Sequence, residues 1–167
     1  MPQELAIFDF TSLTTGTPNC LDISKYSQRE KIEVMEWIIL NTMDNIADDL
    51  PLRHIIHGGV YAREMMIPKG VVLTGKIHLV DHIFTLSQGD LSVMTDDGIK
   101  RIQAPYTFEV RAGIKKIGFA HSDVICTTYH STSLTNIEEI EKELFDDGNI
   151  DWVDNMVNQY LLKQVAA

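Results

Sequence analysis

The stretch GVVLTGKIHLVDHIFTLSQG, residues 70–89, places Lys76, His78 and His82 between two glycines. Side chains two or four residues apart in a β-strand lie on the same face. The three side chains would therefore point the same way if the strand ran without a bulge. An inward row would bring two imidazoles together inside a barrel.

The region around this stretch is rich in short β-strand patterns. From about Leu52 to Thr132, segments of four to eight residues rich in Val, Ile, Thr, Phe and Tyr are separated by turn residues. One turn, Asp97-Gly98, separates two alternating segments and is typical of a β-hairpin. Short strands at such regular intervals predict a β-sandwich or a barrel.

Helical patterns flank the β region on both sides. Ser27-Gln28-Arg29-Glu30 is a capping box, and the helix that it begins should end before Pro51. A second capping box at Thr135 and an apolar pattern from about Asp151 predict two C-terminal helices. The expected organisation is an N-terminal arm and amphipathic helix at 1–51, a barrel at 52–132 and helices at 133–167.

Composition excludes several classes of function. The formal net charge of -10, from 14 basic and 24 acidic residues, disfavours general nucleic-acid binding. No apolar run approaches the roughly 18 residues that span a bilayer, and no signal-peptide pattern opens the chain. We therefore expect a cytoplasmic protein without membrane contact. The two cysteines, Cys20 and Cys126, form no Cys-x-x-Cys pair, so a zinc ribbon is not indicated.

The quoted stretch resembles the first motif of the cupin barrels, which reads Gly, five residues, His-x-His, three or four residues, Glu, six residues, Gly. Lys76 stands at the first histidine of that motif and His82 at the glutamate. Residues 105–120 resemble the second motif weakly, with Gly113 kept and Lys116 at the position of the metal-binding histidine. The resemblance implies a mainly β fold, a single cupin-like jelly-roll barrel with an N-terminal helix and C-terminal helices.

Residues 54–145 also resemble small cupin-like proteins encoded by tailed bacteriophages, through segments such as that from Tyr61 to Glu64. This second resemblance implies a fold and a phage setting but no established activity. The protein would then work in the host cytoplasm or belong to a virion. Cupins commonly pair through their sheets, so a homo-oligomer, with a dimer favoured, is expected.

Histidines are the best candidates for a site, because all six lie in the β region. Neutral imidazole suits zinc, iron and nickel. We expect one divalent transition metal, from zinc, iron, nickel or manganese, on the ligands His78, His82, His121 and His130. The alternative is that these are ordinary strand histidines and that no metal binds.

Lysines at two motif positions suggest a different ligand. An ammonium group beside a metal is electrostatically costly, but a cation inside an empty barrel suits a small anionic ligand. Lys76 is the predicted anion partner, with Tyr61 and Glu64 as further ligand-binding residues. The alternative is that Lys76 and Lys116 face solvent.

Three functions remain open at the level of sequence. The leading one is a phage accessory protein whose barrel binds a metal or a small anion without established catalysis. The second is a virion structural or assembly protein with a vestigial site. The third is a metal-dependent enzyme on a small substrate, with His130 as a fourth ligand or general base and Glu64 as an acid/base group. Catalytic residues cannot be named from the sequence.

Overall fold

The computed structural model describes the backbone of residues 25–42 and 50–165, and the side chains among these up to residue 159. The predicted N-terminal arm up to residue 24 and the second half of the first predicted helix, residues 43–49, lie outside the described residues. The chain divides into two compact units, one of residues 47–148 and one of residues 1–46 and 149–167. The β region belongs entirely to the first unit. No helix among the described residues is long and apolar enough to cross a membrane.

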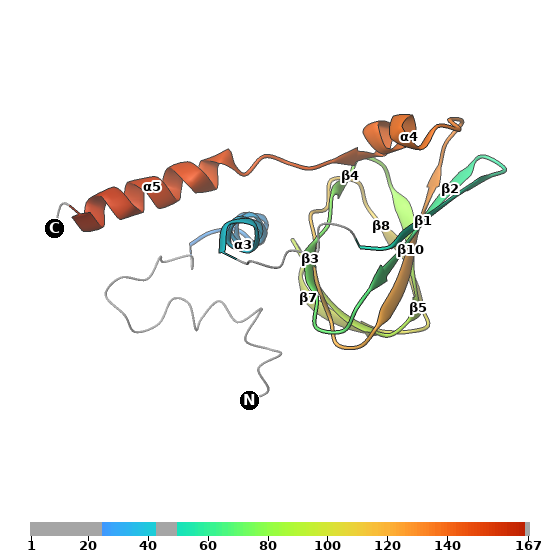
Figure 1. The fold of residues 1–167 in the computed structure, drawn as a ribbon, viewed down its shortest axis with the longest axis horizontal. Coiled ribbons are helices and arrows are strands. Elements are labelled where there is room, and N and C mark those ends of the chain that lie inside the picture. Colours follow the sequence, from blue (N-terminus) through green and yellow to red (C-terminus); the bar gives the residue numbers. More distant parts are fainter. Residues whose placement is uncertain (1–24, 43–49, 166–167) are drawn as a thin grey trace. The chain divides into compact units, whose positions relative to one another are not determined.

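Antiparallel strands dominate residues 50–148 (Figure 1). Their bounds are β1 (Leu52–His57), β2 (Val60–Ile67), β3 (Val72–Thr74), β4 (Ile77–His78), β5 (His82–Gln88), β6 (Asp90–Thr95), β7 (Gly98–Gln103), β8 (Tyr106–Val110), β9 (Ile117–Ala120), β10 (Val124–Ser131) and β11 (Phe145–Asp146).

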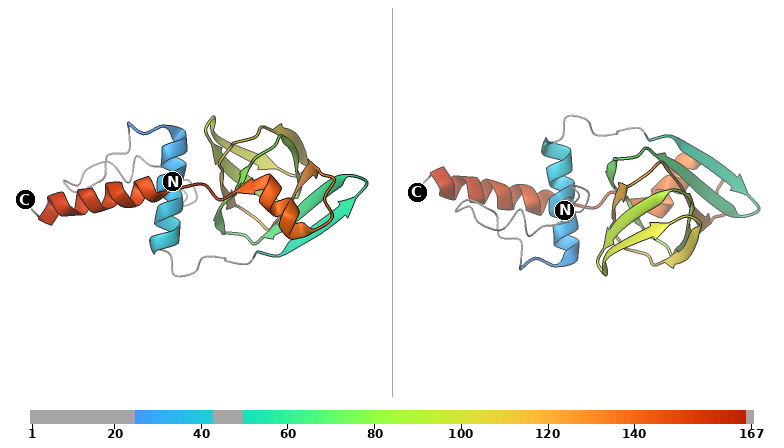
Figure 2. Two further views of the ribbon diagram at one scale, coloured as in Figure 1. Left: turned by 90° about the horizontal axis from the view of Figure 1, so that it is seen from above. Right: turned by 90° about the horizontal axis from the view of Figure 1, so that it is seen from below.

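These strands form two larger sheets that face each other across an interior (Figure 2). One sheet has the order β1-β2-β10-β5-β8 and the other β3-β9-β6-β7. Apart from β1, each sheet has four strands. β10 lies between β2 and β5 in one sheet, and β9 lies between β3 and β6 in the other. This is a jelly roll, so the predicted fold class of a mainly β, cupin-like barrel is confirmed.

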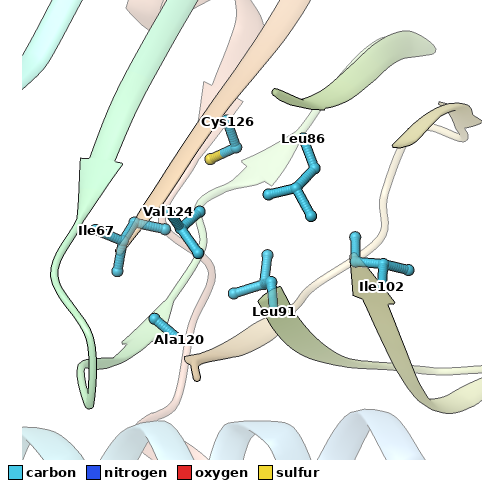
Figure 3. Close-up of a cluster of buried hydrophobic side chains, with 7 residues drawn as sticks. All are labelled: Ile67, Leu86, Leu91, Ile102, Ala120, Val124 and Cys126. Atoms are coloured by element: carbon cyan, nitrogen blue, oxygen red, sulfur yellow. The ribbon is translucent and has the colours of Figure 1, made fainter. Parts of the chain in front are cut away.

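The barrel core is filled from both sheets. Seven buried residues form its main cluster (Figure 3): Ile67, Leu86, Leu91, Ile102, Ala120, Val124 and Cys126. The cluster explains the alternating sequence pattern, because every second side chain of a strand faces inward. The hairpin predicted at Asp97-Gly98 is also confirmed, since Thr95 of β6 pairs with Gly98 of β7.

The strand predicted through residues 76–82 is broken. β4 ends at His78 and β5 begins at His82, with a turn at residues 79–81 between them. The Asp81 carboxylate accepts a hydrogen bond from the Ala112 backbone N–H at 2.8 Å and so fastens this turn to the segment after β8. The premise of one continuous strand was therefore wrong, although both histidines still point inward.

Three helices complete the described chain: α3 (Gln28–Thr42), α4 (Ile137–Leu144) and α5 (Asp151–Val165). The first capping box is confirmed, because Ser27 Oγ accepts from the Glu30 N–H and the Glu30 carboxylate accepts from the Ser27 N–H. At α4 the N-cap is Asn136, whose side chain accepts from the Glu139 N–H. The helix thus begins one residue later than a cap at Thr135 would give.

The helices fall into different units. α4 belongs with the barrel and lies at the end where β4 and the start of β2 are found (Figure 1). α3 and α5 belong to the other unit and contact each other. There the Trp152 indole donates to Glu33 at 2.7 Å, and the Trp37 indole donates to Asp154.

We predict that the two glycines bounding the quoted stretch differ sharply in their tolerance of alanine. Both have positive φ, 84° at Gly70 and 96° at Gly89. A Cβ at Gly89 would lie 2.4 Å from the Asp123 carbonyl oxygen, whereas a Cβ at Gly70 would meet nothing within 4 Å. Gly70→Ala should cost about 1–2 kcal/mol of unfolding free energy, and Gly89→Ala roughly 2–5 kcal/mol.

Urea unfolding followed by far-UV circular dichroism would measure the difference. Tryptophan fluorescence is unsuitable, because both tryptophans lie in α3 and α5, outside the barrel unit. Equal losses in the two variants would contradict the close packing of Gly89 against the β9–β10 turn.

Candidate metal centre

The inner face of the larger sheet sets the position of two histidines. β10 pairs with β2 on one side, with His130 opposite Tyr61. It pairs with β5 on the other side, with Tyr129 opposite Ile83, so the next position brings His130 opposite His82. His82 in turn lies opposite Val110 of β8. One inward row therefore crosses four strands, and two imidazoles lie side by side in it.

A third imidazole joins them from β4. The His78 and His82 rings stack with centroids 3.9 Å apart, and the His130 ring lies 5.0 Å and 4.9 Å from them. His78 Nδ1 and His130 Nε2 are 2.9 Å apart, within hydrogen-bond distance. One ligand nitrogen from each of the three rings lies within 4.8 Å of the others. We call these three residues the histidine cluster.

Burial keeps the histidine cluster neutral. The three side chains are between 1% and 7% exposed. Loss of solvation, followed by repulsion from Lys116, lowers the pKa of His78 to about 2 and the pKa values of His82 and His130 to about 4. All three rings are thus unprotonated at neutral pH, and unprotonated imidazole is the form that binds metals.

Two nitrogens of the histidine cluster have unused hydrogen-bonding capacity. His82 Nε2 and His130 Nδ1 are buried and have no hydrogen-bond partner among the described residues. A buried polar atom without a partner is uncommon and costs free energy. Ligands of a tetrahedral zinc at 2.0–2.1 Å lie about 3.4 Å apart, so small ring movements would suffice to close the cluster round an ion. The residues present therefore fit a metal.

An aromatic side chain closes the cluster on the side of α4. Phe145 of β11 pairs with His78 of β4. Its ring meets His78 and His130 edge-on, at 4.8 Å and 5.5 Å between centroids. Phe145 is itself buried beneath Ile140 and Leu144 of α4. The helix and the short strand thus shield the imidazoles from water.

Two cations lie close enough to the cluster to affect it. Lys116, just before β9, is half-buried, and its Nζ lies 6.0 Å from the centre of the Phe84 ring. Burial lowers the pKa of Lys116 to about 8. No carboxylate of the described residues forms an ion pair with it. Arg63 of β2 is different, because its Nε lies 3.3 Å from a Glu141 carboxylate oxygen.

The structure separates the predicted ligand-binding residues. Tyr61 is fully buried beside His130, with ring centroids 6.2 Å apart. Its hydroxyl lies 2.8 Å from His54 Nδ1, and burial, with the nearby Glu141 charge, raises the pKa of Tyr61 to about 12. Glu64 is three residues further along β2, which places it on the opposite face of the strand, and it pairs with Arg53 at 2.9 Å.

Lys76 does not reach the histidine cluster. Its side chain is exposed, and its Nζ lies 3.4 Å from an Asp147 carboxylate oxygen. The solvent-facing alternative therefore describes Lys76, whereas Lys116 faces inward. β4 begins only at Ile77, so Lys76 precedes the strand and its side chain need not share the face of His78.

His121 also lies outside the cluster. It precedes β10, whereas His130 is near the end of β10, so the length of that strand separates them. His121 Nε2 is 2.7 Å from Ser92 Oγ, and its ring meets Phe119 edge-on. Of the four predicted metal ligands, the structure brings together His78, His82 and His130.

No local sequence pattern indicates two neighbours of the histidine cluster, Phe145 and Arg63. Phe145 belongs to a two-residue strand after α4, and its pairing with β4 spans more than sixty residues of chain. Arg63 stands next to Glu64 in the sequence, but nothing local indicates its contact with Glu141. Both depend on long-range contacts that no local pattern encodes.

We predict that metal-free protein loses stability as the pH falls from about 6.5 towards 4. The unfolded histidines take up protons near their ordinary pKa of 6.5, whereas the folded cluster stays neutral down to about 4. The unfolded state then binds more protons, so acid favours unfolding, by about 1.4 kcal/mol per pH unit for each such histidine. Stability due to this difference is fully present above pH 6.5.

Urea titrations at several pH values, after dialysis against a chelator, would measure the slope. His82→Gln should make the slope shallower, and His57→Gln, at an exposed position, should leave it unchanged. An identical slope in wild type and His82→Gln would argue against a neutral, desolvated cluster.

Comparison with known proteins gives structural likeness only. No family model and no curated protein matches the chain. KdgF from Halomonas sp. is 14% identical with a TM-score of 0.46, covering 58% of this chain and 90% of that one. A cupin superfamily protein from Desulfitobacterium hafniense is 10% identical with a TM-score of 0.44, covering 55% and 84%.

An acetylacetone dioxygenase from Acinetobacter johnsonii is 14% identical with a TM-score of 0.41, covering 48% of this chain and 58% of that one. At such identities and scores these likenesses carry no argument about activity.

Proposed function

We propose that this protein binds one divalent transition-metal ion through His78, His82 and His130. The observation that carries the proposal is the histidine cluster itself: three buried, neutral imidazoles with ligand nitrogens within 4.8 Å of one another. Two of its buried nitrogens lack a hydrogen-bond partner among the described residues, and a metal ion would satisfy that capacity.

The donor set points to the borderline metals. Three imidazole nitrogens suit zinc, nickel and copper, whereas manganese prefers oxygen ligands. Imidazole also suits iron, so within the set of metals expected from the sequence, zinc, iron and nickel are favoured over manganese. The cluster contains no carboxylate, so nothing in it neutralises the charge of the ion.

Three protein ligands also leave room for a ligand from outside. Zinc sites with three protein ligands keep an open position for water or another small molecule. The role we favour is binding, because Glu64, the acid/base group expected from the sequence, lies on the other face of β2 and pairs with Arg53. The metal-dependent enzyme, the virion role, the phage setting and the homodimer stay predictions.

We predict about one zinc ion per chain after equilibrium dialysis of tag-free protein, measured by inductively coupled plasma mass spectrometry. His82→Ala and His130→Ala should each lose most of this metal, because each removes one of three ligands. Zinc should also raise the melting temperature of wild type, since it binds only the folded barrel.

Two histidine variants serve as controls. His57→Ala removes an exposed imidazole, and His121→Ala removes the predicted ligand that lies with Ser92. Both should keep the wild-type metal content. Metal-free wild type, or a His121→Ala variant that loses zinc while His130→Ala keeps it, would refute the proposed ligand set.

A further inference from the structure

A pocket of about 690 Å³ opens beside the edge strands of the two sheets. β7 ends one sheet and β8 ends the other, so the barrel is open between them. The pocket also reaches β6 and the segment that follows β8. Its apolar lining consists of Val93, Ile99, Ile102, Phe108, Val110 and Ile114.

One cation lies deeper in this pocket than the other charged groups. Lys116 lines the pocket and is half-buried. The remaining charged residues of the lining are all exposed, namely Asp97, Lys100, Glu109 and Arg111. Two of these four residues are acidic and two are basic, so their formal charges sum to zero. The net charge of the lining is therefore the single positive charge of Lys116, in a chain whose net charge is -10.

Lys116 also connects the pocket with the histidine cluster. Its Nζ lies 6.0 Å from the centre of the Phe84 ring, and Phe84 is two residues after His82 on the same face of β5. The positive charge of Lys116 also disfavours a proton on each histidine of the cluster. The same repulsion acts on any divalent ion held by the three rings, because a metal ion brings twice the charge of a proton. A metal bound alone would thus face an uncompensated ammonium group.

An anion beside Lys116 would remove that repulsion. Its negative charge would pair with an ammonium group that has no carboxylate partner among the described residues, in surroundings where burial strengthens the attraction. It would also neutralise part of the charge of the metal. Metal and anion would therefore each improve the binding of the other.

We propose that the pocket takes a small monocarboxylate with an apolar body, whose carboxylate pairs with Lys116, and that this anion and the metal ion bind cooperatively. The inference rests on the proposed metal site. One anionic group is specified, because one deep cation is available and the rim charges balance. An apolar body is specified by the lining from β6, β7 and β8.

Benzoate is a suitable probe, with benzamide as a neutral molecule of the same shape. The dissociation constant of zinc is measured by competition with a chromogenic chelator, with no addition, with saturating benzoate and with benzamide. Coupling free energies between sites commonly correspond to about 5- to 150-fold changes in affinity, and we expect benzoate to tighten zinc binding within that range. Benzamide should have little effect. Zinc should tighten benzoate binding by the same factor, as linkage requires.

Three lysine variants identify the charge responsible. Lys116→Met should bind zinc more tightly than wild type without benzoate and should lose the benzoate effect. Lys116→Arg keeps the charge and should keep the effect. Lys76→Met is the matched control, because Lys76 is exposed and paired with Asp147, and it should behave as wild type.

The outcomes separate the two proposals. Zinc binding that benzoate leaves unchanged overturns the present inference and leaves the metal site intact. A benzoate effect that survives in Lys116→Met, or is lost in Lys76→Met, also overturns it. Absence of zinc binding under every condition overturns the metal site, and the coupling with it.

Discussion

The register of β10 between β2 and β5 is the constraint on which the site depends. That register turns His130 inward, next to His82, and turns Tyr129 to the outer face, where it is exposed. A slip of one residue would exchange these two side chains and empty the cluster of its third imidazole. The apolar inward positions of β10, such as Val124 and Cys126, hold the register, because they belong to the main core.

The barrel interior holds two basic side chains, Arg63 and Lys116, together with three imidazoles that could also become positively charged. Arg63 has its partner in Glu141. Lys116, whose Nζ lies 6.0 Å from the centre of the Phe84 ring, forms no ion pair with a carboxylate of the described residues. The three imidazoles stay neutral because their pKa values are lowered, so positive charge does not accumulate inside the barrel. This arrangement of neutral imidazoles near Lys116 links the proposed metal site to the pocket between the edge strands.

Local patterns predicted much of the fold and about half of the site. The hairpin at Asp97-Gly98 follows from short-range spacing. The inward direction of both His78 and His82 does not, because the spacing argument requires one continuous strand and residues 79–81 interrupt it. Local spacing also does not distinguish His121 from His130. His121 precedes β10 and His130 lies within it, and only the pairing of β10 with β5 shows that His130 lies next to His82. The alternation of residues also does not show where Lys76 lies: β4 begins at Ile77, so Lys76 precedes the strand, and its side chain pairs with Asp147.

The place of β10 in the sheet also has a consequence for biosynthesis. β10 is the last strand of the two larger sheets to leave the ribosome, yet it lies between β2 and β5, which are made much earlier. Until it emerges, both neighbours carry an unpaired edge, a feature that favours aggregation. The nascent chain holds His78 and His82 without His130 until β10 joins the sheet, so the proposed metal ion would find all three imidazoles only after the barrel has closed.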